Sequence, residues 1–418
     1  MAGGAAVGRA AAEPQTAWKP ALWAAVASLQ RRPLRVHVAD LGLWGPVCDE
    51  DWGYAYHLER WFRAFLLRCV PSTAAAGPEE ADYVYVPHCA MNVYLARKQR
   101  RYQIMGAASA SALPAHGEGD RLHEQVVREL DSDYLAGEVL PAMRRHAGVS
   151  ACLARAPRCR LLLVNMAFGR DEVPLFSNGL GPEAVVITTA GAERWGRWFG
   201  GRSAPPARRG RAGCSCRAHC EPRLSLGPLD VVVPFATAHN STSRRPGRGG
   251  RRDILALFVG SNTSCSRREL FDMWAMSNRA DLRWDNDDAR LQGLVVSPRP
   301  LPEAAFDRLA RRAVFCLVPD GHWPATMRLP AVIAKGCIPV VISNRVEVPF
   351  DDLVDWREGS LRVLEGQIRE LPELLSRIGE TQVRSMQRHL PLLAEALDYH
   401  HSRFHVMLLA SLAARREP

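Results

Sequence analysis

Short apolar runs alternate with amphipathic segments along this chain, and the alternation predicts parallel strands covered by helices. The run from Val314 to Val318 is unbroken, as expected of a strand buried on both faces of its sheet. Residues 325–335 then have helical character, and Gly336 occupies a position where helices commonly stop. Ile338 to Ile342 forms a second buried run. A strand–helix–strand unit of this kind places a helix N-terminus and a cationic side chain at the carboxyl edge of a sheet, where nucleotide phosphates bind.

The same alternation runs through both halves of the sequence. Strands are expected at 35–39, 83–87, 161–165, 185–189, 230–234, 254–259, 293–297, 314–318, 338–342 and 360–364. Helices are expected at 57–69, 119–145, 267–277, 302–311, 325–335 and 367–378, followed by one long terminal helix over 380–415. This order is typical of doubly wound α/β sheets.

The pattern divides the chain into two Rossmann-like domains. We assign residues 34–240 to the first domain and 253–390 to the second, joined by a basic Arg-Pro-Gly linker at 241–252. Residues 391–418 belong to the terminal helix, which is long enough to pack back across the first domain. Residues 1–33 are rich in Ala, Gly and Pro and are predicted to be a leader or a disordered arm.

Composition describes a globular protein, and the distribution of charge argues against a nucleic-acid partner. Apolar residues make up 47% of the 418 residues and charged residues 23%. Much of the net charge of +10 comes from two Gly- and Arg-rich segments, 201–213 and 244–252, which contain no acidic residue. They are either solvated surface insertions or a source of attraction for an anionic polysaccharide or sugar nucleotide. No segment resembles a module that combines aromatic and basic residues to bind nucleic acid.

The eleven cysteines are many for a cytosolic enzyme. The cluster Cys214, Cys216, His219 and Cys220 is read either as a zinc site or as a loop closed by disulfides. The spacing of its first two cysteines is too tight for a standard zinc knuckle, and no second ligand pair follows, so we favour the disulfide loop. By contrast, Cys316 and Cys337 lie in apolar strands and are predicted to be small core residues.

Targeting signals in the sequence are weak. The longest apolar run near the start, Ala21 to Leu29, is too short to span a membrane, and it lacks the order of a signal peptide. Asn240 and Asn262 begin two glycosylation sequons, which give modest support to a secretory route. We expect no membrane anchor within this sequence.

Five blocks in order, together with the strand–helix–strand unit, resemble the exostosin-like glycosyltransferases (family 47). The unit carries "FCL-P-G", an Arg-Leu pair, "GCIPVVIS" and "E-PF", as in the nucleotide-sugar-binding half of that family. The other blocks are "RVHVADL" (35–41), "PEEADYVYVP" (78–87), "CEPRLSLGPLDVVVP" (220–234), "RRDILALFVGSN" (251–262) and "LVDWREGSLRVLEGQIRELPELLSRI" (353–378).

The resemblance implies the GT-B architecture, in which two Rossmann-like domains face a cleft and the terminal helix packs back across the first. It implies an inverting transferase that moves a sugar from a UDP-sugar to a glycan or glycoprotein acceptor, with no cofactor and no required metal. It also implies a place in the Golgi lumen and association with other glycosyltransferases as homo- or hetero-oligomers. The first domain would serve the acceptor and the second the donor.

The donor's diphosphate is expected to bind near the strand–helix–strand unit. Arg328 is the main candidate, because a guanidinium pairs well with phosphate oxygens; the alternative is a salt bridge on a helix surface. Thr326 and the backbone amides after Gly321 could donate further hydrogen bonds, although Thr326 could equally be a simple helix cap.

Further donor contacts are expected from the start of the second domain and from the loop after 338–342. Gly260 would allow a close backbone approach to the ligand, or is an ordinary turn glycine. Arg267 or Arg268 would face phosphate, or be exposed. Glu347 would take a polar role in binding, or be a solvent-exposed acid.

Two departures from the family pattern fall at the centre of the motif. The family has Glu or Asp three residues after the arginine, plausibly for the ribose hydroxyls, whereas this chain has Ala331. Pro330 removes a helix hydrogen bond unless it lies in the first turn. Weaker donor binding, a different donor or lost catalysis would follow. The alternative function is therefore a weak or inactive pseudo-glycosyltransferase that acts as a glycan-binding or partner subunit.

The catalytic base is expected at the carboxyl edge of the first sheet. Asp40 follows the strand 35–39, His88 follows the strand ending at Pro87, and either side chain could accept a proton. Histidine after a strand is commonly structural. The acceptor-side "DH" and "HD-G" of the family are replaced by Arg158-Cys159 and by the segment 166–169, which also changes the acceptor side.

Overall fold

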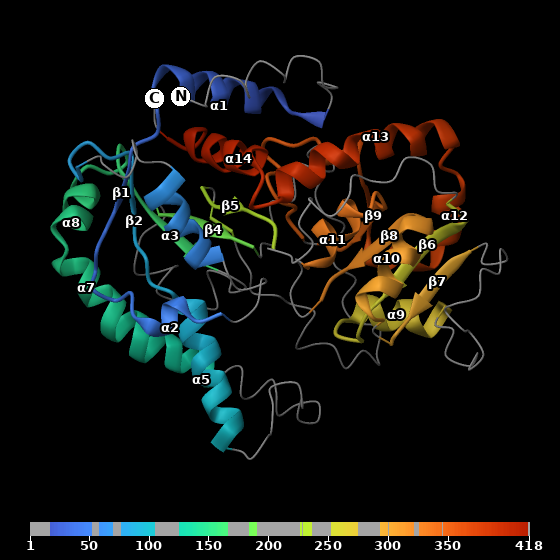
Figure 1. The fold of residues 1–418 in the computed structure, drawn as a ribbon, viewed down its shortest axis with the longest axis horizontal. Helices are drawn as coiled ribbons and strands as arrows, with labels where there is room; N and C mark the ends of the chain where they lie inside the picture. Colours follow the sequence, from blue (N-terminus) through green and yellow to red (C-terminus); the bar gives the residue numbers. More distant parts are fainter. Residues whose placement is uncertain are drawn as a thin grey trace.

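The computed structural model describes the chain over residues 17–51, 58–69, 77–104, 125–165, 184–189, 226–227, 229–235, 252–274, 293–299, 301–321, 326–344 and 346–416. Within these ranges the fold consists of two five-stranded parallel sheets with helices around them (Figure 1). Of the expected linker, residues 241–252, the structure describes only Arg252.

The first sheet has its strands in chain order. They are β1 (Val36–Val38), β2 (Tyr83–Tyr85), β3 (Arg160–Asn165), β4 (Val185–Thr188) and β5 (Val231–Val232). The strands after β1 are buried on both faces almost throughout, which accounts for their unbroken apolar sequences. The helices of this half are α2 (Pro46–Asp49), α3 (Leu58–Cys69), α5 (Ala90–Ile104), the π-helical η4 (Leu130–Val139), α7 (Leu140–Arg145) and α8 (Ala147–Ala154).

The second sheet is parallel and has the strand order β10-β9-β8-β6-β7. The chain places β7 on one side of β6 and all later strands on the other side, so the topological switch point lies between β6 and β8. Its strands are β6 (Ile254–Val259), β7 (Leu294–Ser297), β8 (Ala313–Pro319), β9 (Ile338–Ile342) and β10 (Leu361–Val363). The helices of this half are α9 (Cys265–Trp274), α10 (Glu303–Arg312), α11 (Arg328–Ala334), the 3₁₀ helices η7 (Trp356–Glu358) and η8 (Glu365–Glu370), and α12 (Leu371–Ser376). The register pairs Ala256 with Phe315 and Phe315 with Ile338. Two domains built on parallel sheets agree with the predicted GT-B architecture.

Where the sequence suggested one long terminal helix, the structure has two, α13 (Glu380–Leu397) and α14 (Ser402–Ala413). The break falls at Asp398–His401, where the His401 side chain accepts a hydrogen bond from the Arg403 amide and caps α14. The prediction of a single helix was wrong because this cap was not recognised as a helix start.

The C-terminal segment connects the two domains, as expected. Figure 1 shows α13 along the second domain and α14 along the first. The Tyr83 hydroxyl of β2 donates to the Leu412 carbonyl (2.7 Å), and Arg415 donates to the Asp230 carbonyl (2.9 Å). In addition, the Phe350 amide in the loop after β9 donates to the Val232 carbonyl at the end of β5 (2.9 Å). That loop is thereby held against the carboxyl edge of the first sheet.

The N-terminal segment from residue 17 is folded, which corrects the expectation of a leader or disordered arm up to residue 33. Helix α1 (Pro20–Arg31) buries Leu22 and Ala25 and lies beside α14 (Figure 1). Trp18 forms an antiparallel bridge with Val354. Composition suggested disorder, but alanine is the strongest helix former, and apolar residues at helical spacing are enough to bury one face.

Three disulfide bonds join described cysteines: Cys48–Cys89, Cys152–Cys159 and Cys316–Cys337. The interpretation of Cys316 and Cys337 as unbonded core residues was therefore wrong. Both side chains are buried, but parallel pairing of β8 with β9 brings them together, and burial alone does not separate a bonded from a free cysteine. The Cys214–Cys220 cluster lies outside the described residues.

Candidate functional site

The carboxyl ends of β6 and β8 form the crevice where the strand order of the second sheet reverses. In open parallel sheets, ligands bind in this crevice. Gly260 follows β6 directly, and Asp320 with Gly321 follows β8. Three of the predicted donor residues, Gly260, Arg267 and Arg328, meet in this crevice.

Arg328 begins α11, and its half-buried side chain points towards β6. Its guanidinium lies over the Phe258 ring, with Cζ 4.8 Å from the ring centroid. Its Nε is buried without a hydrogen-bond partner, and no carboxylate pairs with it within the described ranges. Burial, and secondarily the charge of Arg267, lower the pKa of Arg328 to about 9. The guanidinium is therefore still charged at neutral pH, and the alternative of a surface salt bridge does not describe it.

Arg267 approaches the same ring from α9 and is only 7% exposed. Its Cζ is 5.7 Å from the Phe258 centroid, its Nε donates to the Asp320 carbonyl (2.7 Å), and its Nη1 donates to the Ser261 carbonyl (3.2 Å). Burial lowers the pKa of Arg267, and the charge of Asp320 partly opposes this. Two guanidinium groups around one aromatic ring repel each other, so an anion between them would be strongly favoured.

Asp320 is the nearest acid, but its environment weakens it as a counterion. Burial, followed by the charge of Glu365, raises the pKa of Asp320 well above its usual range. Its Oδ1 atom is buried without a hydrogen-bond partner. The raised pKa makes Asp320 a weaker counterion for Arg267.

Gly260 is needed for space beside Arg328 and not for an unusual backbone conformation. A Cβ atom at this position would lie 2.5 Å from Nη2 of Arg328, a distance that side chains essentially never adopt. The backbone does not need a left-handed conformation here, and the Gly260 amide donates to the Ser297 carbonyl (3.0 Å). The glycine is therefore required by the position of the guanidinium.

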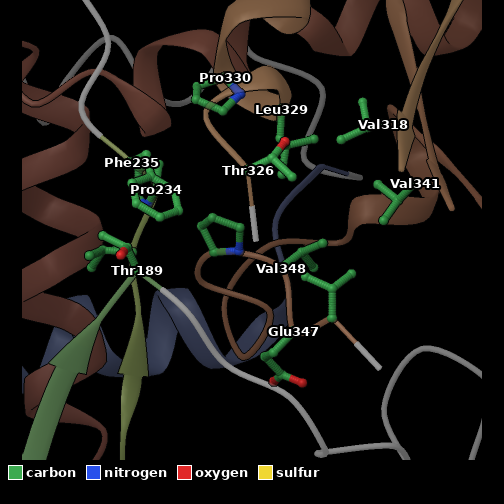
Figure 2. Close-up of a pocket in the computed structure, with 13 residues that line it drawn as sticks. Thr189, Pro234, Phe235, Val318, Thr326, Leu329, Pro330, Val341, Glu347 and Val348 are labelled. Atoms are coloured by element: carbon green, nitrogen blue, oxygen red, sulfur yellow. The ribbon is translucent and has the colours of Figure 1, made fainter. Parts of the chain in front are cut away.

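A small pocket, with about 20 Å³ open to a water molecule, lies beside α11 between the two sheets (Figure 2). Residues at the carboxyl ends of β4 and β5 form one wall, and α11 with the loop after β9 forms the other. The lining residues are Thr189, Val233, Pro234, Phe235, Val318, Thr326, Leu329, Pro330, Val341, Val346, Glu347, Val348 and Pro349.

Thr326 and Glu347 are the two predicted residues that line this pocket. The Thr326 hydroxyl accepts a hydrogen bond from the Arg328 amide (3.2 Å), so it caps the start of α11 and faces the pocket as well. Glu347 is 8% exposed, which is not the environment of a solvent-exposed acid. Its charge acts on Arg362, whose pKa is lowered mainly by burial.

The other predicted donor residues lie less centrally. Arg268 is exposed on α9, next to the buried Arg267. Gly321 is partly buried directly after Asp320, at the mouth of the crevice. Pro330 is the third residue of α11, in the first turn, where a missing N–H breaks no helix hydrogen bond. Ala331 is 9% exposed and places no polar atom in the site.

In the first domain, the two candidate bases have opposite environments. Asp40 is exposed just after β1, and its Oδ1 accepts a hydrogen bond from the Gly42 amide (3.1 Å). His88 is 2% exposed, and its Nδ1 accepts from the Ala90 amide (3.2 Å) and lies 3.8 Å from Glu59. Burial lowers the pKa of His88 to about 4. A buried, neutral ring held by backbone groups is poorly placed to take a proton from an acceptor, so the geometry favours Asp40.

Several residues of the site were missed by sequence reasoning. Phe258 lies against both guanidinium groups. In the sequence it is part of an apolar strand, and nothing there distinguishes it from a core residue. Thr189 and the walls of the pocket depend on how the two domains meet, and no local signal carries that information. The topological switch point offered a usable signal, because it singles out the residues that follow β6 and β8.

Two further observations concern other ligands and membranes. Within the described ranges, no group of three or more His, Cys, Asp or Glu side chains is arranged to hold a metal ion. Among the helices that the structure describes, none is both long and apolar enough to cross a membrane.

Part of the chain is similar to known proteins. Residues 214–378 match the Exostosin GT47 domain. A protein of Arabidopsis thaliana named as a probable glycosyltransferase is 29% identical over 147 residues, covering 33% of this chain and 28% of the relative. Another, named as a probable glucuronoxylan glucuronosyltransferase, is 40% identical over 90 residues, covering 21% of this chain and 19% of the relative.

Among solved structures, a UDP-forming alpha,alpha-trehalose-phosphate synthase from Burkholderia vietnamiensis covers 91% of this chain and 98% of its own, with 10% identity and a TM-score of 0.36. A score this low carries no argument, and the description of the fold rests on the two parallel sheets themselves.

The two parallel sheets and the basic crevice suit a nucleotide-binding α/β protein. The match to the Exostosin GT47 domain covers less than half of the chain, and it agrees with the resemblance drawn from the sequence. The alignments span less than a third of the length of these two relatives.

Proposed function

We propose that this chain is an inverting glycosyltransferase that moves a sugar from a UDP-sugar to a glycan or glycoprotein acceptor. The observation that carries the proposal is the pair Arg267 and Arg328, which surround the Phe258 ring at the switch point of the second sheet. Within the described ranges no carboxylate pairs with Arg328, and burial raises the pKa of the nearby Asp320. Such a site is suited to a diphosphate.

The two arginines would act on the negative charge that develops on the leaving diphosphate. As the glycosidic bond to the donor breaks, negative charge accumulates on the departing diphosphate, and preorganised cations stabilise it most when water is excluded. Arg328 stays charged at neutral pH and can donate from its unpaired Nε. Arg267 is fixed by two backbone carbonyls, so it needs little reorganisation.

The acceptor would approach from the first domain. Inversion requires that the acceptor hydroxyl lose its proton while it attacks the face of the sugar opposite the diphosphate. Asp40 lies at the carboxyl edge of the first sheet and is exposed, so we propose Asp40 as the base. Its Oδ2 atom remains available, because the hydrogen bond from Gly42 uses Oδ1.

We also propose that the protein works in the Golgi lumen, in association with other glycosyltransferases. Three disulfide bonds between described cysteines support an oxidising compartment. Asn262 of the second sequon is exposed, as glycosylation requires. The association with other glycosyltransferases is supported by the family resemblance.

Release of UDP tests the transferase function. The purified chain is incubated with a panel of UDP-sugars, including UDP-glucuronic acid because relatives are named as glucuronosyltransferases, and free UDP is measured against a buffer control. At least one donor should release UDP above background, and Arg328→Met should abolish the release. The matched control is Arg384→Met, which removes an exposed arginine of α13 paired with Glu380.

Ala331 favours a second candidate, a pseudo-glycosyltransferase that binds sugar nucleotide or glycan without turnover. Ala331 gives α11 no acid at this position for the ribose hydroxyls. UDP binding without UDP release from any donor would support this candidate. In that case, Ala331→Glu should strengthen UDP binding if the missing acid is the cause.

A further inference from the structure

Asp320 contacts the two crevice arginines through its backbone and not through its carboxyl group. Its carbonyl oxygen accepts hydrogen bonds from Nε of Arg267 (2.7 Å) and from the hydroxyl of Ser264 (2.9 Å). Within the described residues, the Asp320 carboxylate forms no ion pair with Arg267 or Arg328. The two guanidinium groups therefore stay available for an anion, although an acid lies beside them.

The carboxyl group of Asp320 is held by the residue that follows β9 and by a residue of β10. The register of β8 with β9 places Asp320 and Ser343 side by side at their carboxyl ends, and the Ser343 hydroxyl hydrogen-bonds with the Asp320 carboxyl group. Arg362 of β10 donates from Nε to the Ser343 carbonyl (3.4 Å). The charge of Arg362 acts on Asp320 more strongly than the charge of Arg267 does. The carboxyl group is thus drawn towards β9 and β10, away from the crevice between β6 and β8.

A free carboxylate at this position would compete with a diphosphate. Carboxylate and phosphate oxygens both form charge-assisted and often bidentate hydrogen bonds with a guanidinium group. Because the carbonyl oxygen of Asp320 lies 2.7 Å from Nε of Arg267, the carboxyl group of the same residue can reach that guanidinium once its side chain turns. A pair of this kind would neutralise one of the two crevice arginines before a ligand binds.

We propose that Arg362 is a positioning residue, which keeps the Asp320 carboxyl group away from Arg267 and so leaves the diphosphate site open. The inference rests on the proposed function and adds a residue to its donor site. The charge of Arg362 also acts on Glu347 and Asp351. The role assigned here concerns Asp320 alone, so the test separates the Asp320 carboxylate from the other acids.

Removal of the Arg362 charge should weaken the binding of phosphate in particular. Dissociation constants for UDP and for uridine are measured calorimetrically in the purified full chain. Arg362→Met should weaken UDP binding about tenfold and change uridine binding by less than about twofold, because the released Asp320 carboxylate competes only with phosphate. Arg362→Lys should recover part of the loss. The matched control, Arg357→Met, removes an exposed arginine paired with Asp355 and should bind UDP like the unaltered chain.

A second substitution at Asp320 identifies the competing acid. In the double variant Arg362→Met, Asp320→Asn, the backbone carbonyl still accepts from Arg267 but the amide cannot form an ion pair, so UDP binding should return to within about threefold of the unaltered chain. Glu347→Gln in the Arg362→Met background should not restore UDP binding. Asp320→Asn alone should tighten UDP binding by no more than about threefold, because Arg362 already holds the carboxyl group aside. The double variant also removes both charges, so it leaves no unpaired Asp320 carboxylate to prevent folding.

The outcomes separate this inference from the proposed function. A purely structural Arg362 would change UDP and uridine binding together, and Asp320→Asn would not restore UDP binding. Either result overturns the inference and leaves the transferase proposal standing, as does a tenfold gain in UDP affinity from Asp320→Asn alone. If Arg362→Met does not fold, Arg362→Gln with and without Asp320→Asn decides in the same way. If UDP does not bind to the unaltered chain, the proposed function fails and this inference fails with it.

Discussion

Replacing Arg328 with methionine should separate binding from stability. Methionine keeps an unbranched apolar chain that can still contact Phe258 but removes the charge. If Arg328 binds diphosphate, the variant should lose affinity for UDP while the free protein stays as stable as before or becomes more stable. A structural arginine would behave in the opposite way, because its removal would lower the melting temperature.

The structure sets the size of the stability change. The pKa of Arg328 falls from 12.5 to about 9, so keeping its charge in the folded chain costs at most about 5 kcal/mol. Solvent reaches the half-buried side chain and reduces this to roughly 1–2 kcal/mol. The cost is present in full at pH 7, below the folded pKa, and is relieved only as the pH rises above about 9. Loss of the contact with Phe258 removes about 1 kcal/mol of cation–π stabilisation. Together these terms predict a melting temperature that is unchanged or raised by up to about 1 °C.

Thermal denaturation with and without UDP is the assay. UDP at about 100 times its dissociation constant should stabilise the unaltered chain by about 2.7 kcal/mol, which raises the melting temperature by roughly 3 °C. If Arg328→Met weakens binding about tenfold, the same UDP concentration should add only about 1.4 kcal/mol. Arg384→Met should respond to UDP like the unaltered chain. An unchanged response to UDP in Arg328→Met, or a large fall in its melting temperature without UDP, would refute the reasoning.

Three further predictions follow from the second sheet and from one buried acid. Gly260→Ala places a methyl group 2.5 Å from the Arg328 Nη2 position, so it should displace the guanidinium and weaken UDP binding at least tenfold by calorimetry; unchanged affinity would show that the guanidinium's position is not needed. The double variant Cys316→Ala, Cys337→Ala opens a 21-residue loop that contains the donor motif, so denaturant titration should show a loss of about 3 kcal/mol, and a loss below about 1 kcal/mol would contradict this. Burial raises the pKa of Glu59 to about 8, so the folded chain keeps a proton that the unfolded chain releases. The free energy of unfolding should therefore fall by up to about 2 kcal/mol from pH 6.5 to 8. Melting curves at both pH values should show this fall, and Glu59→Gln should remove most of it.

The strands could be predicted from the sequence because burial on both faces leaves unbroken apolar runs. The expected strands 254–259 and 338–342 agree with β6 and β9 to the residue. Helix α5 was missed because its apolar residues Val93, Tyr94 and Leu95 are adjacent instead of following helical spacing. Tertiary packing against α2 and η4 stabilises this helix where its own sequence pattern gives no signal.

The candidate site was predictable only in part. Arg328 and Gly260 could be placed at one sheet edge because both follow recognisable strands. Their direct contact, and the contact of both Arg328 and Arg267 with the Phe258 ring, depend on side-chain directions that no sequence pattern specifies. Thr189 reaches the pocket because the Phe350 amide bonds to β5 and brings the two domains together, which is a long-range contact.

Calorimetric titration with UDP, UMP and uridine tests the central claim most directly, because these ligands differ only in phosphate. If Arg267 and Arg328 form a diphosphate site, two charge-assisted contacts should make UDP bind about a hundredfold more tightly than uridine, with UMP between them. Arg328→Met should reduce the advantage of UDP over uridine to about tenfold or less. Equal binding of UDP and uridine, or no binding of UDP at millimolar concentration, would contradict the claim.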